Sequence, residues 1–429
     1  MGRTKEHHAP SVALVGAGVR GLGYARRAAA QGARIVAVAE PRTQARADFA
    51  TEFGLAPDQA FADAADLLAA ARVADAVVIA SPDPCHADQA VLAARQGYAI
   101  LLEKPMALTE EDCARVITAV EQAGVVFAVG HVLRYTPYTR LLKGLLDAGR
   151  IGTIVSVEHL EPVGWWHQAH SYVRGNWRRE DQSGPMLLTK SCHDIDWLMH
   201  VMGESPARVA SFGSLSHFTA ANKPATATDT CVTCPIEQSC AFSAKRSYLQ
   251  CLGDPVREYW PLSMVTSDRT EAGVLEALRE SPYGRCVYSC DNDAVDHQVV
   301  ALEFPSGSTA SFTMTAFTEL THRKTRIFGT LGCLEGDGEA VRVHDFVTDR
   351  SEEHRVPSLH GASAADGHGG GDDALVNAFL DAVASGDQSH LSSDARTSLA
   401  SHRVVWAAES ARRTGTVATL PHDLDVPPS

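Results

Sequence analysis

Residues 12–21 read Val-Ala-Leu-Val-Gly-Ala-Gly-Val-Arg-Gly, an apolar run followed at once by a glycine-rich turn. The four apolar residues are typical of a buried parallel strand. Gly16, Gly18 and Gly21 have the G-x-G-x-x-G spacing, which permits a tight turn, close approach of the backbone to a pyrophosphate, and close packing of the following helix. Because an Ala-rich helix and a second strand come directly after it, the stretch predicts the first βαβ unit of a dinucleotide-binding fold.

The same turn supplies the predicted cofactor contacts. We expect the helix N-terminus at Val19 and Arg20 to hold the phosphates. Glu40 ends the second strand, where a carboxylate can accept both ribose hydroxyls of NAD and would repel a 2′-phosphate. Arg42 and Arg46 follow closely and could bind a 2′-phosphate, so NADP is the alternative cofactor. The sequence therefore predicts NAD as the cofactor.

Strands and helices continue to alternate up to residue 135, which predicts a doubly wound parallel sheet. Ligands bind such sheets beyond the carboxyl ends of the strands. Three segments fall at these ends: Ser81 to His86, Glu103-Lys104-Pro105 and His131 to Pro137. The residues expected beside the cofactor are Ser81, Pro82, His86, Glu103 and Lys104, and those expected beside the substrate are His131 and Arg134.

Length, charge and cysteine content limit the number of domains, the kinds of partner and the compartment that we expect for this protein. A chain of 429 residues predicts more than one domain. The 38 Lys and Arg against 52 Asp and Glu give a net charge of −14, which disfavours nucleic acid or an anionic membrane as partner. We find no apolar run long enough to span a membrane and no leader pattern, and the ten cysteines fit a reducing compartment, so we expect a cytoplasmic protein.

The second half of the chain has a different pattern. Thr153 to His159, Val299 to Phe304 and Thr309 to Thr315 alternate as strands with one solvated face, and Pro305-Ser306-Gly307 is a hairpin turn. We therefore predict an α/β chain in which an N-terminal Rossmann domain is followed by an α+β domain with a large, mainly antiparallel sheet. The predicted boundaries are 1–135, 136–370 with a Cys-rich insertion at about 220–290, and 371–429 for the C-terminal helices.

Several motifs together resemble one family. Glu103-Lys104-Pro105 is similar to its E-K-P, Ser81 to His86 to its S-P-x-x-x-H, and Arg134 to Pro137 to its R-Y-x-P. Gly184 to His193 with Asp196 looks like its segment carrying a catalytic histidine. Over nearly its whole length the chain thus resembles the Gfo/Idh/MocA oxidoreductases, named in part for glucose-fructose oxidoreductase and inositol dehydrogenase. The resemblance implies a homo-oligomer, a dimer or tetramer, that binds NAD and a sugar or polyol.

The resemblance also implies catalytic roles. It places Lys104 beside the nicotinamide and the substrate hydroxyl, and a lysine there can polarise the oxygen that must lose its proton. His193 is the expected proton carrier, because imidazole titrates close to working pH. Many relatives carry an Asp four residues before this histidine, where this chain has Thr189. Lys190 lies next to that position, and on one predicted helix it shares a face with His193, so it is the third expected catalytic residue.

Aromatic and basic side chains precede this segment and suggest a wall for a sugar. They are His170, Tyr172, Arg174, Trp177 and Arg178, and Lys190 and His193 complete the expected substrate contacts. Their positive charge also admits an anionic sugar. The alternative is a solvated basic turn packed on an aromatic ring.

Cysteines cluster in the insertion. Cys231, Cys234 and Cys240 have a C-x2-C-x5-C spacing that suits zinc, with Cys286 or Cys290 as a fourth ligand. Free thiols and an iron–sulfur cluster are the alternatives. The insertion sets this chain apart from typical members of the family that it resembles.

Three functions compete. The leading prediction is an NAD-dependent oxidoreductase acting on a secondary hydroxyl of a sugar or polyol. The second is a glycosidase in which NAD transiently oxidises a ring carbon so that the glycosidic bond leaves by elimination, with an anionic, sulfoquinovoside-like glycoside as one substrate. The third is a non-catalytic NAD sensor or scaffold, which intact Lys104 and His193 disfavour.

Overall fold

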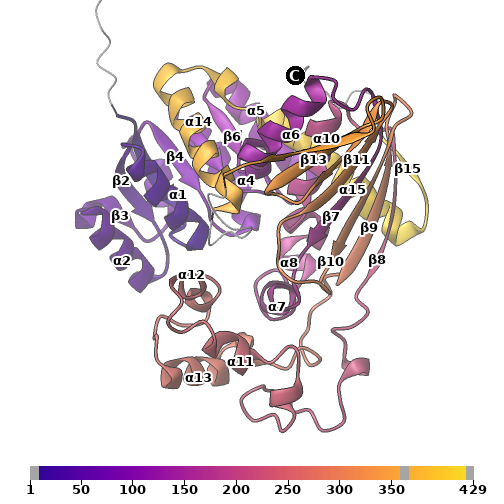
Figure 1. Cartoon of the computed structure of the whole chain (residues 1–429). Helices are drawn as coiled ribbons and strands as arrows, with labels where there is room; N and C mark the ends of the chain where they lie inside the picture. Colours follow the sequence, from indigo (N-terminus) through magenta and orange to yellow (C-terminus); the bar gives the residue numbers. More distant parts are fainter. Residues whose placement is uncertain (1–8, 358–366, 422–429) are drawn as a thin grey trace, which may run out of the picture. The chain divides into compact units, whose positions relative to one another are not determined.

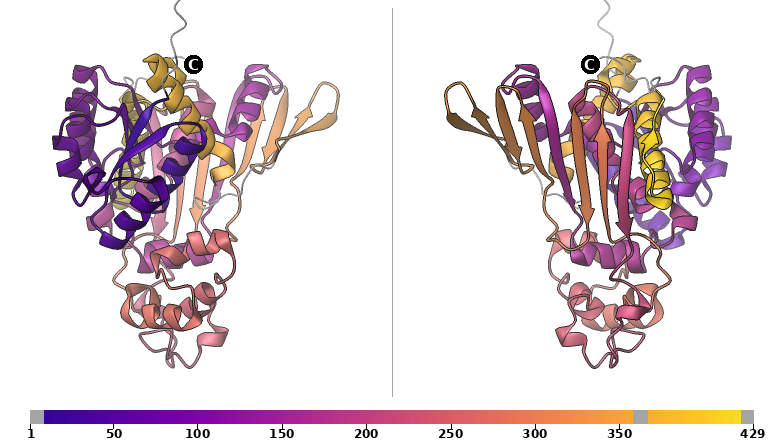
Figure 2. Two further views of the ribbon diagram at one scale, coloured as in Figure 1. Left: turned by 90° about the vertical axis from the view of Figure 1, so that its left-hand side faces the viewer. Right: turned by 90° about the vertical axis from the view of Figure 1, so that its right-hand side faces the viewer.

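The computed structural model describes residues 9–357 and 367–421. They form two compact units (Figures 1 and 2). Of the described residues, the first unit takes in those up to Thr136 and Gly370–Arg403, and the second takes in those of Pro137–Gly369 and those from Val404 to residue 421. In these residues no helix combines the length and the apolar character needed to cross a membrane.

The first unit is built on a parallel sheet of six strands in the order β3-β2-β1-β4-β5-β6. Its strands are β1 (Ser11–Val15), β2 (Arg34–Ala39), β3 (Ala60–Phe61), β4 (Ala76–Ile79), β5 (Ala99–Leu102) and β6 (Phe127–Val129). Its helices are α1 (Val19–Ala30), α2 (Thr43–Phe53), α3 (Ala64–Ala69), α4 (His86–Arg95), α5 (Glu110–Ala123) and α14 (Gly371–Ser385). The strand order reverses at β1, which confirms the predicted doubly wound sheet.

Local sequence explains how these elements begin and end. The five residues of β1 are all buried, as expected for a central parallel strand covered on both faces. Helix α5 begins after Thr109, whose side chain accepts a hydrogen bond from the Asp112 backbone, and acidic residues fill its first turn. It ends at Gly124, which adopts the left-handed conformation with φ of 62°.

Helix α14 returns to the first unit from far along the chain. Its apolar residues Leu375, Val376 and Phe379 lie in the same buried cluster as Leu14 of β1 and Tyr24 of α1. The helix therefore completes the core that covers one side of the parallel sheet.

The second unit contains a mixed sheet of nine strands in the order β14-β13-β12-β11-β7-β10-β9-β8-β15. Its strands are β7 (Ile154–Pro162), β8 (Arg208–Ser214), β9 (His297–Glu303), β10 (Thr309–Thr315), β11 (Lys324–Gly329), β12 (Gly332–Gly336), β13 (Ala340–Asp345), β14 (Arg350–Arg355) and β15 (Ala418–Thr419). All neighbours are antiparallel except β10 and β7. The predicted large, mainly antiparallel sheet is confirmed, and the β13–β14 hairpin extends past its other strands (Figure 2).

Helices and an insertion accompany this sheet. The segments before β8 are α6 (Pro137–Asp147), α7 (Trp165–His167), the π-helical η4 (Gln168–Arg174), α8 (Glu180–Ser183), α9 (Met186–Thr189) and α10 (Cys192–Met202). Between β8 and β9 lie α11 (Ala244–Leu249), α12 (Pro255–Tyr259) and α13 (Glu271–Glu280), which Figure 1 shows beyond the strand ends. The insertion has an apolar cluster of its own, which includes Tyr248, Leu262 and Leu278. The last helix, α15 (Ala395–Thr414), belongs to both units, which divide after Arg403.

Candidate functional site

Of the three glycines in the turn between β1 and α1, Gly18 is the one with open space where a side chain would be. Gly16 has a φ of +89°, and a Cβ there would lie 2.6 Å from the carbonyl oxygen of Ala80. A Cβ on Gly21 would lie 1.9 Å from the carbonyl oxygen of Gly16, so the helix packs tightly on the turn. At Gly18 the nearest atom to such a Cβ is 3.9 Å away. The turn therefore fits a diphosphate that approaches at Gly18 and the N-terminus of α1.

Glu40 lies directly against this turn. Its carboxylate is 3% exposed and accepts hydrogen bonds from the backbone amides of Ala17 and Arg42, both at 2.9 Å. Arg42 Nε also donates to it at 2.8 Å. Burial would raise the pKa of Glu40, but the hydrogen bonds and the charge of Arg42 lower it overall, so the group is ionised. An ionised acceptor at the end of β2 can bind ribose hydroxyls.

The carboxyl group of Glu103 is held in place within the first unit. Arg20 Nε donates to its Oε1 at 2.6 Å, and the Tyr24 hydroxyl donates to the same atom at 2.9 Å. Its Oε2 accepts a hydrogen bond from the backbone amide of Lys104 at 2.8 Å. Burial would raise the pKa of Glu103, yet Arg20 and Lys104 lower it overall, so the carboxylate is charged. Glu103 thus positions the backbone of the next residue, Lys104.

The residues after Lys104 are fixed as well. The carbonyl of Pro105 is hydrogen-bonded to His86 Nδ1 at 2.7 Å, and the other nitrogen of His86 lies 3.0 Å from the Ser81 carbonyl. The backbone amide of Met106 donates to His402 Nε2 at 3.0 Å. His86 is fully buried, so it ties the segment at residues 81–86 to the Glu103-Lys104-Pro105 segment. The half-buried Lys104 side chain therefore extends from a rigid backbone.

Two expected substrate residues of the first unit are buried against its later segments. His131 is fully buried, and its ring meets that of His402 edge to face, with centroids 5.9 Å apart. Arg134 is 8% exposed and donates from Nη1 to the Ser392 carbonyl at 2.8 Å. These contacts anchor the C-terminal segment, and they leave a substrate role for both residues a prediction.

In the second unit, the predicted single helix around His193 is divided in two. Helix α9 ends at Thr189 and α10 begins at Cys192, and Ser191 between them has φ of −110° and ψ of 13°, outside the helical region. The expectation of one continuous helix was wrong, so Lys190 and His193 do not share the face of one helix. Thr189 is fully buried and donates its hydroxyl hydrogen bond to the Pro185 carbonyl at 3.4 Å.

The break lets Lys190 join a buried cluster of charges. Lys190 Nζ lies 2.9 Å from Glu161 Oε1 on β7, and Arg323 Nη2 lies 3.0 Å from Glu161 Oε2. Arg323 also pairs with Asp194, which is 3.2 Å from His159 Nε2. Burial would raise the pKa of Asp194, but Arg323 and His159 lower it well below its usual value. Arg323 thus contacts two buried carboxylates, those of Glu161 and Asp194.

Glu161, His159 and Arg323 were missed by the sequence analysis, although a signal existed for two of them. Along β7 the side chains of Val157, His159 and Glu161 are buried while that of Glu158 is exposed. Polar residues at the buried positions of an alternating strand indicate a structured polar site rather than a solvated face. His193 lies beside this cluster in sequence, is 6% exposed, and has its ring centroid 6.2 Å from that of His368.

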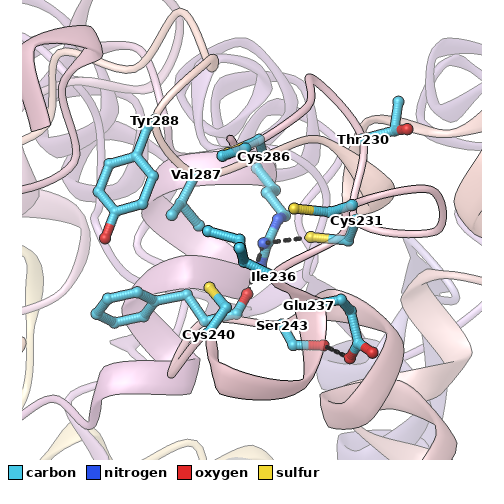
Figure 3. Close-up of a pocket in the computed structure, with 13 residues that line it drawn as sticks. Thr230, Cys231, Ile236, Glu237, Cys240, Ser243, Cys286, Val287 and Tyr288 are labelled. Carbon is cyan, nitrogen blue, oxygen red and sulfur yellow. Dashed lines mark hydrogen bonds between the residues drawn. The ribbon is translucent and has the colours of Figure 1, made fainter. Parts of the chain in front are cut away.

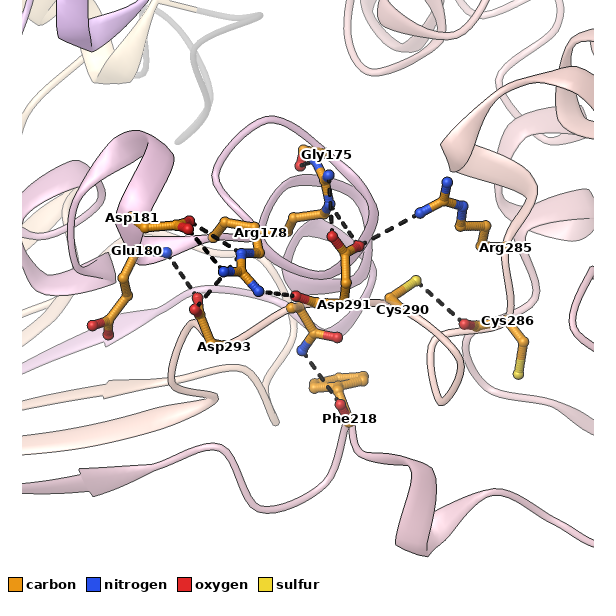
Figure 4. A network of polar contacts seen from close by, with 12 residues as sticks. Gly175, Arg178, Glu180, Asp181, Phe218, Arg285, Cys286, Cys290, Asp291 and Asp293 are labelled. Atoms are coloured by element: carbon orange, nitrogen blue, oxygen red, sulfur yellow. Dashed lines mark hydrogen bonds and ion pairs between the residues drawn. The ribbon is translucent and has the colours of Figure 1, made fainter.

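Two of the residues expected to form a sugar-binding wall, His170 and Arg174, contact the insertion, and a third, Arg178, pairs with a residue just after it. His170 Nδ1 is hydrogen-bonded to the Tyr248 hydroxyl at 2.8 Å, and burial, with the charge of Arg174, lowers the pKa of His170 to about 3. Arg174 donates from Nη2 to Cys231 Sγ at 3.5 Å. Arg178 pairs with Asp291 at 2.9 Å in a surface network (Figure 4).

The two remaining residues of the expected sugar-binding wall are aromatic. Tyr172 and Trp177 stack with centroids 5.9 Å apart, and Tyr172 is 2% exposed. The structure therefore brings Tyr172 and Trp177 together, and it directs His170 and Arg174 toward the insertion.

Four cysteines of the insertion line one small cavity (Figure 3). They are Cys231, Cys234, Cys240 and Cys286. The cavity has a volume of about 20 Å³, which suffices for one water-sized occupant. Cys290 does not line it, and its Sγ donates to the Cys286 carbonyl. Within the described residues, no group of three or more His, Cys, Asp or Glu side chains is arranged to hold a metal ion.

Comparison with known proteins finds two family models that match the chain. Residues 11–131 match the model of an oxidoreductase family with an NAD-binding Rossmann fold, and residues 143–420 match the model of that family's C-terminal alpha/beta domain. Among solved structures, an oxidoreductase from Agrobacterium radiobacter in complex with NAD+, L-tartaric acid and magnesium superposes with a TM-score of 0.70. It is 16% identical, and the match covers 96% of this chain and 98% of that one, which shows a common fold.

Curated relatives match over shorter stretches. The 2,7-anhydro-N-acetylneuraminate hydratase of Escherichia coli is 32% identical over 154 residues, which span 35% of this chain and 40% of the relative. The scyllo-inositol 2-dehydrogenase (NAD(+)) of Bacillus subtilis is 26% identical over 281 residues, 65% of this chain and 69% of the relative. With both family models matched in order along nearly its whole length, the chain belongs to the Gfo/Idh/MocA family of oxidoreductases.

Proposed function

We propose that the protein is an NAD-dependent oxidoreductase that acts on a secondary hydroxyl of a sugar, a sugar derivative or a polyol. The observation that carries this proposal is the fixed backbone of Lys104, which lies in the same unit as a glycine turn with room for a diphosphate at Gly18. A dehydrogenase relative whose name includes NAD(+) supports the reaction class.

The proposed roles follow from the chemistry of each side chain. NAD, when bound, supplies a hydride acceptor for the carbinol carbon. The ammonium of Lys104 donates a hydrogen bond to the substrate hydroxyl and stabilises the negative charge that develops on its oxygen. His193 accepts the hydroxyl proton and passes it to water.

We propose that the pair formed by Lys190 and Glu161 replaces the aspartate of other family members. Thr189, at that position, is buried and hydrogen-bonded to its own segment, so it does not act as a base. Lys190 is 17% exposed in its side chain and is held by Glu161, so it keeps access to a ligand while its charge is balanced. It would bind a substrate oxygen or tune His193.

A second candidate function has specific support. The Escherichia coli relative is a hydratase of an anhydro sugar, and a hydratase adds or removes water without a net oxidation of its substrate. We therefore keep the NAD-dependent glycosidase as the alternative, with an anionic glycoside such as a sulfoquinovoside among its substrates. It would use the same Lys104 and His193 to oxidise a ring carbon transiently.

One experiment separates the two functions. The purified chain is incubated with NAD and a panel of inositols, aldoses, anhydro sugars and glycosides, including a sulfoquinovoside. The oxidoreductase accumulates NADH, measured at 340 nm, whereas the glycosidase releases aglycone without net NADH. Lys104→Met should reduce either activity by about 100-fold or more while NAD binding persists. Activity that survives this substitution would refute the proposed role of Lys104.

We also propose that the four cysteines bind a structural zinc ion. Arg174 supports this proposal, because it is 2% exposed and donates to the carbonyls of Arg285 and Phe242 and to Cys231 Sγ. These three partners are two carbonyl oxygens and a sulfur, and none of them is a carboxylate. A buried cation needs a negative partner, and zinc-bound thiolates would supply one. Binding would require the thiols to turn toward a common point.

Metal analysis tests the zinc proposal. Protein purified without chelator should contain about one zinc per chain by elemental mass spectrometry, and Cys231→Ser and Cys286→Ser should lose it. Cys290→Ser is the matched control and should retain it, because Cys290 does not line the cavity. Zinc-free protein with four titratable thiols would show that the cluster consists of free thiols.

Two further properties belong to this proposal. Phe212 on β8 and Val299 on β9 are paired across the sheet and are 70% and 40% exposed. An apolar pair on an open sheet face supports a homo-oligomer, either a dimer or a tetramer, which light scattering would measure. A reducing, cytoplasmic location is supported by ten cysteines without a disulfide among the described residues.

A further inference from the structure

Asp372 is a fully buried carboxylate at the start of α14. Both of its oxygens accept hydrogen bonds from Arg20, Nη1 to Oδ2 and Nη2 to Oδ1, each at 2.9 Å. The two residues are 352 positions apart in sequence. A two-point contact of this kind fixes the plane of the guanidinium as well as its place.

The fixed guanidinium reaches the backbone of Lys104 through one further residue. Arg20 Nε donates to Glu103 Oε1 at 2.6 Å, and Glu103 Oε2 accepts from the Lys104 amide at 2.8 Å. Because Asp372 holds the two outer nitrogens of Arg20, it also sets the direction in which Nε points. A continuous chain of charged hydrogen bonds therefore runs from α14 to Lys104.

The charges in this series of contacts are balanced, and its two carboxylates, Glu103 and Asp372, are buried. Arg20 lies between two buried carboxylates, and their charges raise its pKa although burial opposes this. Arg20 also lies over the ring of Tyr24, with its central carbon 4.6 Å from the ring centroid. Without the Asp372 carboxylate, Arg20 would keep Glu103 and Tyr24 as partners but would lose the contact that prevents its rotation.

Apolar packing also holds α14 in place. Leu375, Val376 and Phe379 are buried in the core of the first unit. A Cβ on Gly371 would lie 2.5 Å from the carbonyl oxygen of Val132, so the helix start already fits closely against its neighbour. A buried ion pair costs desolvation energy and is a weak source of net stability. The pairing of Asp372 with Arg20 therefore calls for a role other than anchoring.

We infer that Asp372 is a positioning residue that holds Arg20, and through it Glu103, so that the Lys104 backbone stays in one conformation. This inference rests on the proposed catalytic role of Lys104. The residue touches neither cofactor nor substrate in this account, and its effect is transmitted through two side chains. The C-terminal part of the chain thereby contributes to the site built by the N-terminal part of the first unit.

Asp372→Asn tests the inference, because it keeps the shape of the side chain and removes its charge. Asp373→Asn is the matched control, since Asp373 is the next residue, is 41% exposed and pairs with Arg27 at 3.2 Å. In the full-length protein, Asp372→Asn should lower kcat about 10- to 100-fold. The dissociation constant for NAD should change less than about twofold. Asp373→Asn should leave both unchanged.

A double-mutant cycle separates positioning from a general loss of structure. If Asp372 acts through Glu103, adding Asp372→Asn to Glu103→Gln should lower kcat little further. If Asp372→Asn does not fold, Arg20→Lys replaces it, because lysine keeps the charge and loses the two-point contact. Equal kcat in Asp372→Asn and Asp373→Asn, or full additivity with Glu103→Gln, would overturn the inference.

A second readout does not depend on turnover. Reductive methylation with ¹³C labels the lysines, and the Lys104 signal is assigned by its absence in Lys104→Arg. Its chemical shift should change in Asp372→Asn and remain unchanged in Asp373→Asn. If the wild type oxidises no substrate, the proposed function fails while this spectrum still decides the inference. An unchanged Lys104 signal in Asp372→Asn would contradict it.

Discussion

Lys190 lies in the short break between helices α9 and α10, and its Nζ is 2.9 Å from Glu161 Oε1. The Glu161 carboxylate is almost completely buried and is shared with Arg323. Removing one partner of such a cluster leaves an uncompensated charge in a place without water.

Glu161→Gln should therefore destabilise the second unit and impair catalysis. We expect the free energy of unfolding to fall by about 3 kcal/mol, because Lys190 and Arg323 lose their shared anion. Chemical denaturation measures this change. Lys143→Met is the control, because Lys143 pairs with the exposed Asp147 and should cost about 0.5 kcal/mol or less. A similar effect of the two substitutions would show that the buried cluster contributes no more than a surface pair.

Glu40→Ala should weaken NAD binding by about tenfold, since a charged acceptor beside the glycine turn is lost. Affinity for NADP should change less, because its 2′-phosphate gains from the removal of a negative charge. Calorimetric titration of both cofactors measures the ratio. Glu52→Ala, which removes a surface partner of Arg26 in the same unit, should alter neither affinity. Tighter binding of NADP than of NAD by the wild type would reverse our cofactor assignment.

The stability of the second unit should depend on pH through Asp194. Its folded pKa is lowered below the unfolded value of about 3.9, despite burial and because of Arg323 and His159. The stabilisation is therefore complete above the unfolded pKa and is lost as the pH falls through the folded pKa. Circular dichroism should show acid unfolding below about pH 4. Asp194→Asn should be less stable than the wild type at neutral pH. Its stability should not show this loss as the pH falls.

The stability of the second unit should also depend on pH through His170, beginning at a higher pH than for Asp194. Its folded pKa of about 3 lies below the unfolded value of about 6.5, so neutral His170 stabilises the fold fully above pH 6.5. That contribution declines as the pH falls from about 6.5 to about 3. His170→Gln should flatten the melting temperature between about pH 6.5 and pH 4, and an unchanged pH profile would disprove the assignment.

Those parts of the fold that a short motif determines by its own geometry could be predicted from the sequence. The turn at Gly16, Gly18 and Gly21 has the close contacts expected from its spacing. The alternation of strands and helices predicted the parallel sheet. In both cases the physical requirement acts on neighbouring residues, so the pattern can be seen along the chain.

Contacts between distant segments could not be predicted in this way. Asp372 and Arg20 are 352 residues apart, and Met106 and His402 are 296 residues apart. Their meeting depends on how α14 and α15 return to the first unit, which no local pattern specifies. The wall of basic and aromatic residues was hard to interpret for a different reason. Its first part forms a π-helix, so the spacing of an α-helix does not say which way His170 and Arg174 point.

The return of α14 also matters during synthesis of the protein. Domains generally fold as units while the chain emerges from the ribosome. Here the unit with the glycine turn lacks its Leu375, Val376 and Phe379 core residues, and the buried partner of Arg20, until residues beyond Phe379 have been made. An incomplete nascent chain therefore exposes apolar surface beside the parallel sheet. The nucleotide-binding unit therefore reaches its final form only after Gly370–Arg403 have been made.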